Sequence, residues 1–417
     1  MNADRINVSA ANMRRLLARL AGFTAEPTGV TRLLYTREWL EAQAYVAEQM
    51  DQLGFQVRSD RVGNVFGRLE GASGEAAVVL TGSHIDTVRA GGKYDGAYGI
   101  AAGIAALDYL RNCYGAPVRT LEVASFCEEE GSRFPFAYWG SGNVTGVCDW
   151  READRYADAD GVTLREAMEA VGFGRASQAD CVRRDLAAFV ELHIEQGVML
   201  ERTRHDIGIV RAIVGQRRYR VMVRGEANHA GTTPMSMRKD ALACAAEMIL
   251  RVEALALGEG EPLVATVGRL EPVPNTPNVV PGSAVFTLDV RHADGPALDR
   301  FCLAVLESIA DIALRRGLTA EASRHLGVEP TPLYEPFQEE MEHICCRRQL
   351  SFLRMVSGAG HDAQLLQAVC PSALIFVPSR GGISHSPDEY TPPDALDKGL
   401  LVLTELLYKL AYEERLP

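Results

Sequence analysis

The apolar positions in the first half of the chain follow two different periods. Residues 37–53 carry apolar side chains mostly at helical spacing, and Gly54 follows as a stop signal. Residues 99–110, rich in Ala and Ile, also predict a helix. Short apolar runs that are typical of buried strands lie at 76–80, 121–126 and 188–193. Buried strands separated by helices predict a largely parallel sheet with crossover helices.

The middle of the chain has a different pattern, in which residues 218–225 alternate as a half-exposed strand. The elements predicted after it are a helix at about 237–256, strands at 263–270 and 284–292, and a helix at about 296–316. An apolar run at 373–377 and a helix at about 394–413 then resemble the first half again. The pattern therefore predicts an α/β fold in which one domain, residues 1–212 and 331–417, is interrupted by an α+β domain of residues 213–330.

Composition narrows the class of protein without indicating its chemistry. The 417 residues include 43 Lys and Arg against 55 Asp and Glu, a formal net charge of −12. This acidity argues against nucleic acid and anionic membranes as partners, and no apolar run approaches the roughly 20 residues of a membrane span. Nine scattered cysteines without a CxxC motif, and an N-terminus without the apolar core of a signal peptide, predict a cytoplasmic protein with reduced thiols.

Histidines recur at the ends of the predicted strands, where open α/β sheets bind their ligands. His84 follows the run at 76–80, His193 ends the run at 188–193, and His385 lies in a loop after 373–377. Each histidine alone also fits a surface or core position without function. Asp86, two residues after His84, is placed to accept the second ring N–H and orient the imidazole.

Carboxylates accompany these histidines. Asp95 lies between glycines in GGKYDG, and Glu128, Glu129 and Glu130 come one residue after the strand at 121–126. A turn aspartate and a solvated acidic loop are the plain alternatives. Adjacent carboxylates at a buried strand end are nevertheless unfavourable without a cation or proton. Together the groups form a nitrogen and oxygen donor set suited to Zn²⁺, Mn²⁺, Co²⁺ or Ni²⁺.

The middle domain has polar candidates of its own. His229 lies in NHAGTTP, Asn278 in PNVVP, and Arg291 follows the apolar part of the predicted strand, residues 286–290. Arginine is the natural bidentate anchor for a substrate carboxylate, although a surface ion pair is an equal alternative here. Gly360, in the small-residue loop GAGHD, could line a site or only turn the chain.

Eight motifs in order give the chain a family resemblance. They are GSHIDT, GGKYDG, EEEGSRF, ELHIEQG, NHAGTTP, NVVPG, SGAGHDA and GISHSP. They resemble the amidase branch of the dinuclear zinc aminoacylase/carboxypeptidase superfamily, and the resemblance as a whole runs from about Val30 to Pro387. This branch holds N-carbamoyl-L-amino acid hydrolases, β-ureidopropionase-like enzymes, ureidoglycolate amidohydrolases and allantoate amidohydrolases.

The resemblance implies a role for each matching residue and a domain of Zn-peptidase type with an inserted ferredoxin-like lid that dimerises. Two divalent ions per subunit, Zn²⁺ or Mn²⁺, would be held by His84 and His193 on one side and Glu130 and His385 on the other, with Asp95 as the bridge. Glu129 would be the general base, chosen over Glu128 because the family's paired glutamates precede the glycine directly. His229 would help bind the developing oxyanion, often across the dimer. Asn278 and Arg291 would bind the substrate carboxylate, with Gln196, Gln216 and Gly360 as further substrate contacts.

The resemblance also implies a small anionic ureido substrate. GVTRLLY, GQRRY and EEEGSRF look most like the allantoate amidohydrolases of purine catabolism, which makes allantoate the leading substrate. N-carbamoyl-L-amino acids are the alternative. A dipeptidase and an inactive binding protein on the same fold are also considered.

Overall fold

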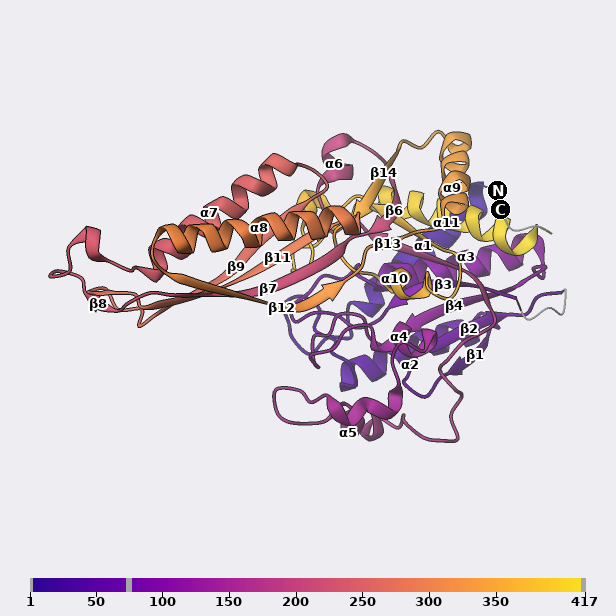
Figure 1. Ribbon diagram of the computed structural model, residues 1–417. Coiled ribbons are helices and arrows are strands. Elements are labelled where there is room, and N and C mark those ends of the chain that lie inside the picture. Colours follow the sequence, from indigo (N-terminus) through magenta and orange to yellow (C-terminus); the bar gives the residue numbers. More distant parts are fainter. Residues whose placement is uncertain (1–2, 73–76, 414–417) are drawn as a thin grey trace. The chain divides into compact units, whose positions relative to one another are not determined.

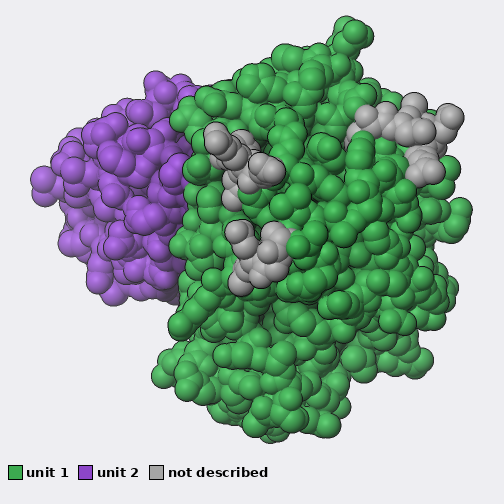
Figure 2. Space-filling view, turned by 90° about the vertical axis from the view of Figure 1, so that its right-hand side faces the viewer, with its two compact units in different colours: residues 1–211, 333–355, 361–417 green, residues 212–332, 356–360 purple. Residues whose placement is uncertain are grey.

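The computed structural model describes residues 3–72 and 77–413 and divides the chain into two compact units (Figures 1 and 2). Unit 1 comprises residues 1–211, 333–355 and 361–417, and unit 2 comprises 212–332 and 356–360. Residues 356–360, which the sequence pattern assigned to the larger domain, group with unit 2. Residue 76 of the predicted strand 76–80 lies outside the described residues. None of the described helices combines the length and apolarity that crossing a membrane requires.

The elements follow one another along the chain with these bounds. Up to residue 213 they are α1 (Ala3–Leu20), α2 (Arg37–Gln52), β1 (Gln56–Ser59), β2 (Val65–Leu69), β3 (Val78–His84), α3 (Ala97–Tyr114), β4 (Thr120–Phe126), α4 (Trp139–Thr145), α5 (Leu164–Ala170), β5 (Leu186–Ile194), α6 (Met199–Thr203) and β6 (Ile207–Ile213). Beyond it they are β7 (Gly215–Arg224), β8 (Asn228–His229), α7 (Ala241–Glu259), β9 (Val264–Val273), β10 (Val279–Val280), β11 (Ser283–His292), α8 (Gly295–Arg315), β12 (Thr319–Val328), β13 (Thr331–Pro332), α9 (Glu335–Arg348), β14 (Phe352–Ser357), α10 (Asp362–Leu366), β15 (Ser372–Val377) and α11 (Pro393–Tyr412). Short 3₁₀ turns lie at Trp150–Arg155, Met235–Met237 and Arg380–Gly382.

A mixed sheet forms the centre of unit 1, with the strand order β1-β2-β4-β3-β5-β15-β6. The four strands β4, β3, β5 and β15 are parallel to one another, and antiparallel pairs flank them on both sides. Every residue of β3, β4 and β15 is buried, as expected for strands whose two faces are both covered. Helices α3 and α11 pack on this sheet. The predicted α/β fold class with a mostly parallel sheet is confirmed.

Unit 2 is a four-stranded antiparallel sheet, in the order β12-β7-β11-β9, with helices α7 and α8 packed on one face. The buried face includes Val221, Phe286 and Leu288, which pack with both helices in one apolar cluster. The sequence pattern missed β12. This edge strand is mostly exposed, so its apolar periodicity is weak.

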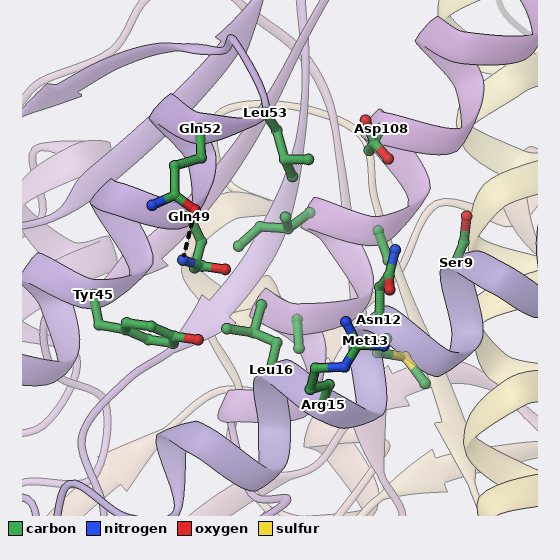
Figure 3. Close-up of a pocket in the computed structure, with 13 residues that line it drawn as sticks. Ser9, Asn12, Met13, Arg15, Leu16, Tyr45, Gln49, Gln52, Leu53 and Asp108 are labelled. Carbon is green, nitrogen blue, oxygen red and sulfur yellow. Dashed lines mark hydrogen bonds between the residues drawn. The ribbon is translucent and has the colours of Figure 1, made fainter.

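A cavity of about 230 Å³ in unit 1 lies among α1, α2 and α3 (Figure 3). Apolar side chains such as Met13 and Leu16 line part of it, and amide side chains add a polar part, where Gln49 Nε2 donates to Gln52 Oε1 at 3.2 Å. None of the site residues predicted from the sequence lines this cavity.

Candidate metal centre

The predicted histidines and carboxylates of unit 1 meet at one end of the parallel strands. His84 is the last residue of β3, and His193 lies next to the end of β5. Glu130 follows β4 and His385 follows β15. Because β4, β3, β5 and β15 are neighbours in the sheet and run in the same direction, their carboxyl ends lie along one edge. The sheet topology alone thus gathers side chains from positions 84 to 385.

Asp95 lies at the centre of this cluster. Its Oδ1 is 3.4 Å from His84 Nε2 and 3.1 Å from His193 Nε2. Its Oδ2 is 3.3 Å from His385 Nε2, and that same nitrogen is 3.3 Å from Glu130 Oε1. One carboxylate therefore faces two histidines with one oxygen and a third histidine with the other.

The ring orientations of two histidines direct Nε2 towards Asp95. His84 Nδ1 lies 3.2 Å from the backbone oxygen of Asp86, and His193 Nδ1 lies 2.9 Å from that of Ile194. Since these carbonyl oxygens only accept hydrogen bonds, Nδ1 carries the proton and the Nε2 lone pair faces the cluster. In His193 this lone pair also accepts the backbone N–H of Gly96 at 3.1 Å, a hydrogen bond that a metal ion would replace. Asp86 Oδ1 is also 3.2 Å from His84 Nδ1, as the sequence analysis expected.

The three consecutive glutamates have different surroundings. Glu128 is buried, and its carboxylate accepts backbone hydrogen bonds from Gly131 and Trp139. The backbone N–H groups of Glu129 and Glu130 instead donate to the two oxygens of Asp86, at 3.0 and 3.3 Å. The carboxylate of Glu128 thus stabilises the loop that follows β4, whereas the carboxylates of Glu129 and Glu130 face the cluster.

The electrostatics of the cluster show an excess of negative charge. Burial raises the pKa of Glu129 well above its usual range, against the opposing effect of His84. Burial also lowers the pKa of His193, but its hydrogen bond to Asp95 outweighs this and leaves the pKa raised. Hydrogen bonds to Asp95 and Glu130 raise the pKa of His385 to about 10. In each case the surroundings favour an added positive charge, either a proton or a cation.

The donor groups fit metal ions. Three sets of ligand atoms lie within 4.8 Å of one another: His84, Asp95 and His193; Asp95, Glu130 and His385; and His84, Glu129 and Glu130. The first two sets share Asp95, and a shared carboxylate is how two metals about 3.5–4 Å apart are usually bridged. Mixed imidazole and carboxylate donors suit Zn²⁺ and Mn²⁺. The third set shows that Glu129 also lies within reach of a metal.

Gln196 belongs to this centre by contact. Its Nε2 donates to Asp95 Oδ2 at 2.9 Å and lies 3.4 Å from His385 Nε2. Gln196 has a positive φ of 56°, directly after the exit of β5. The sequence analysis placed it among the substrate contacts, whereas here it touches the carboxylate expected to bridge the metals.

The predicted residues of unit 2 form two groups. His229 in β8 pairs with Val279 in β10, and the backbone N–H of Ala230 donates to Asn278 O at 3.0 Å. These contacts bring NHAGTTP and NVVPG together. His229 is exposed, and its Nδ1 accepts the backbone N–H of Gly231 at 3.0 Å. Nε2 therefore carries the ring proton and can donate a hydrogen bond.

The second group lies on the sheet face opposite the buried apolar side chains, where β7 and β11 pair Gln216 with Arg291 and Arg218 with Asp289. Asp289 accepts hydrogen bonds from all three partners: Gln216 Nε2 at 2.6 Å, Arg218 Nε at 2.7 Å, and Arg291 Nε and Nη2 at 3.1 and 3.3 Å. Arg291 Nη1 donates to Gly358 O at 2.8 Å. A cavity of about 570 Å³ is lined by Arg218, Asp289, Arg291 and Gly358 among others. Gly360 ends the short segment of unit 2 that contains Gly358.

Two buried carboxylates of unit 1 were missed by the sequence analysis. Glu191 is fully buried and accepts from Ser83 Oγ at 2.8 Å and from the backbone of Ala363 at 2.9 Å. Asp362 is fully buried as well. Two signals in the sequence could have indicated them: the GHDA motif for Asp362, and a glutamate inside an apolar strand for Glu191. A charged residue that is buried needs a specific partner, so each of these positions points to a polar contact.

Asp362 leads to a prediction about pH. Burial, together with the charge of Glu191, raises the pKa of Asp362 to about 8, against about 3.9 in an unfolded chain. The folded state thus binds this proton more tightly than the unfolded chain does. The contribution to the unfolding free energy is fully present below about pH 4 and is lost as the pH rises towards 8. We expect the unfolding free energy of the metal-free protein to decrease over this range, and to decrease less in Asp362→Asn. Urea titrations across the range test this, and equal slopes for both proteins would contradict it.

Comparisons with known proteins agree with this arrangement. Residues 80–409 match the family model of peptidase family M20/M25/M40. The chain is 48% identical to an allantoate amidohydrolase of Bacillus subtilis (strain 168), over 92% of this chain and 93% of the relative. It is 37% identical to an N-carbamoyl-L-amino-acid amidohydrolase of Paenarthrobacter aurescens, over 96% and 98%. The structure of a hydantoinase/carbamoylase family amidase from Burkholderia multivorans matches 97% of this chain and 98% of its own, with a TM-score of 0.92 and 34% identity.

The chain therefore belongs to the amidohydrolase branch of peptidase family M20/M25/M40. The resemblance drawn from the eight sequence motifs is confirmed.

Proposed function

We propose that the protein is a metal-dependent amidohydrolase that cleaves a linear ureido C–N bond, with allantoate as its substrate. Water and allantoate would give ureidoglycine, ammonia and CO₂, a step of purine catabolism. The observation that carries the activity is the convergence of three histidines on Asp95, beside Glu129 and Glu130. The 48% identity to an allantoate amidohydrolase supports the choice of substrate.

Two divalent ions, Zn²⁺ or Mn²⁺ and less readily Co²⁺ or Ni²⁺, would be held by the residues that surround Asp95. His84 and His193 would bind one ion, Glu130 and His385 the other, and Asp95 would contact both. Bound ions of this kind supply a Lewis acid that makes a water molecule more acidic and polarises the scissile carbonyl.

Glu129 is the side chain proposed to move the proton. Its carboxylate takes a proton from the attacking water and passes it to the leaving nitrogen. A group that both accepts and donates a proton works best when its pKa lies near the working pH. Burial raises the pKa of Glu129, and a higher pKa makes its carboxylate a stronger base towards the attacking water. Glu128 is already engaged with two backbone donors and is the poorer candidate.

Unit 2 is proposed to hold the substrate. His229 presents an Nε2–H that can stabilise a developing oxyanion, because Gly231 occupies its Nδ1. Arg291 has five N–H donors. Among the described residues, three of these donors bind Asp289 and Gly358, and one N–H on each terminal nitrogen is left for a carboxylate. Asn278 and Gln216 are the further polar contacts proposed there.

Arg291→Ala should raise KM and leave kcat nearly unchanged, because a carboxylate distant from the reacting carbon is bound equally in the ground and transition states. A hydrogen bond to a charged group contributes about 1.5–3 kcal/mol, or roughly 10- to 150-fold in KM. Steady-state kinetics measure both constants. Arg220→Ala, an exposed arginine on the neighbouring strand β7, is the matched control. An unchanged KM in Arg291→Ala would remove Arg291 from the substrate site.

A substrate panel tests the proposed function. Purified protein loaded with Zn²⁺ or Mn²⁺ should release ammonia from allantoate and be much slower on N-carbamoyl-L-amino acids and dipeptides. A reversed preference would make the protein an N-carbamoyl-L-amino acid hydrolase, which the 37% identical relative keeps as the alternative. Fewer than one metal per chain and no hydrolysis would indicate a binding protein.

The proposal extends to the assembly and the cellular location of the protein. A homodimer through unit 2 follows from the family resemblance, and size-exclusion chromatography with light scattering tests it. All nine cysteines fall in the described part of the chain and are free thiols, which is compatible with the cytoplasm.

A further inference from the structure

Glu389 is a buried carboxylate that no step of the proposed mechanism uses. It lies four residues after His385 and is only 4% exposed. A buried carboxylate must be compensated by hydrogen bonds or by a positive charge. The hydrogen-bond partners of Glu389 therefore indicate its structural role.

The two oxygens of Glu389 join two segments that are nearly 300 positions apart. Oε1 accepts the backbone N–H groups of Tyr94 at 2.9 Å and Asp95 at 3.3 Å. Oε2 accepts the hydroxyl of Ser384 at 2.8 Å. Ser384 Oγ in turn lies 3.3 Å from Asp95 Oδ2. Glu389 thus holds the backbone at Asp95 and, through Ser384, the loop that carries His385.

The approach of Glu389 to the Asp95 turn depends on Gly92. A Cβ atom at position 92 would lie 2.0 Å from both Cδ and Oε1 of Glu389. Such a contact is impossible without moving the carboxylate. Gly92, the second glycine of the GGKYDG motif, therefore makes room for Glu389. The sequence analysis did not assign this role to it.

The ligands of the two expected metal sites differ in how firmly they are held. His84 and His193 lie on β3 and β5, are almost fully buried, and have Nδ1 contacts with their own strands or the following turn. His385 lies on a loop, with 48% of its side chain exposed and a left-handed φ of 53°. Its position consequently depends on whatever holds the loop.

We infer that Glu389 is a positioning residue for the metal site formed by Asp95, Glu130 and His385. It aligns the Asp95 carboxylate with the His385 loop, so its loss weakens this site more than the one formed by His84, Asp95 and His193. The inference rests on the two-metal centre of the proposed function. Residues that orient metal ligands typically contribute 10- to 100-fold in metal affinity.

The test measures metal retention of the full-length protein, without any assay of activity. Zn²⁺-loaded protein is dialysed against buffers of graded free Zn²⁺, and the metal per chain is determined by elemental analysis. Glu389→Gln keeps the shape but replaces one of the two acceptor oxygens with an N–H₂ group, so either the two backbone N–H groups or the Ser384 hydroxyl lose their acceptor. We expect one of the two ions to leave at about 10- to 100-fold higher free Zn²⁺ than in the wild type, and the other to leave as before.

Two variants identify which ion is affected and exclude a general effect. His385→Gln should release the same ion as Glu389→Gln. Asp60→Asn alters another buried carboxylate of unit 1, which accepts backbone N–H groups of Val62 and Asn64, and should retain both ions. If Glu389→Gln does not fold, Ser384→Ala removes the hydroxyl that joins Glu389 and Asp95 to the His385 loop, leaves the backbone contacts of Glu389 in place, and should weaken the same ion.

The outcomes separate the inference from the proposed function. A wild type that never holds two ions contradicts the two-metal centre itself. A wild type with two ions, and a Glu389→Gln variant that holds both equally well or loses both equally, overturns the role assigned to Glu389 alone.

Discussion

The Glu129→Gln variant should lose between about 10²- and 10⁴-fold in kcat, the range that a positioned general base contributes, while it keeps its metal ions. The amide has nearly the shape of the carboxylate but cannot take a proton from water. The backbone N–H of Glu129, which donates to Asp86 Oδ1, is unaffected by the substitution. Steady-state kinetics on allantoate and metal analysis of the same preparation measure the two effects.

Glu128→Gln is the matched control, because it makes the same chemical change one residue earlier. Glu128 accepts the backbone N–H groups of Gly131 and Trp139, so this variant should lower the melting temperature and spare most of kcat. If kcat falls far more in Glu128→Gln than in Glu129→Gln, the general base is assigned to the wrong glutamate. If Glu129→Gln loses a metal ion, Glu129 is a ligand, as the set of His84, Glu129 and Glu130 allows.

Asp95→Asn should remove both the metal ions and the activity. Asp95 Oδ1 faces His84 and His193, and Oδ2 faces His385. An asparagine has a single acceptor oxygen and a donating amide group, so it cannot serve both sides. We expect fewer than one metal ion per chain after loading with Zn²⁺, and turnover at background.

Loss of the carboxylate also removes the main group that raises the pKa values of His193 and His385. Asp158→Asn is a suitable control, since Asp158 pairs with Arg133 outside the metal centre and should retain two ions. Two ions per chain in Asp95→Asn would show that this carboxylate does not bridge them.

Most of the secondary structure that positions the centre could be predicted from periodicity. The runs at 121–126 and 188–193 correspond to β4 (Thr120–Phe126) and β5 (Leu186–Ile194), because strands buried on both faces carry apolar residues at nearly every position. Elements with a weak or mixed pattern were missed. The exposed edge strand β12 is one of them. Helix α1 was also missed, although its buried residues Met13, Leu16, Leu17 and Leu20 follow a helical period.

The order of the strands was also beyond the sequence pattern. Periodicity identifies a strand but not its neighbours, and β15 lies next to β5 although about 180 residues separate them. Only this adjacency brings His385 to the side of the sheet edge where His84 and His193 lie.

The sequence by itself determined the family and the candidate metal-binding residue types. The reason is that these histidines and carboxylates lie in short motifs at strand exits, which can be recognised without knowing the fold. The tertiary structure alone decided the surroundings of each group. It assigned Glu128 to the loop, let Asp289 hold Arg291, Arg218 and Gln216, and brought Glu389 against Asp95. The physical reason is that a buried charge is defined by the partners that surround it, and most of these partners come from distant parts of the chain.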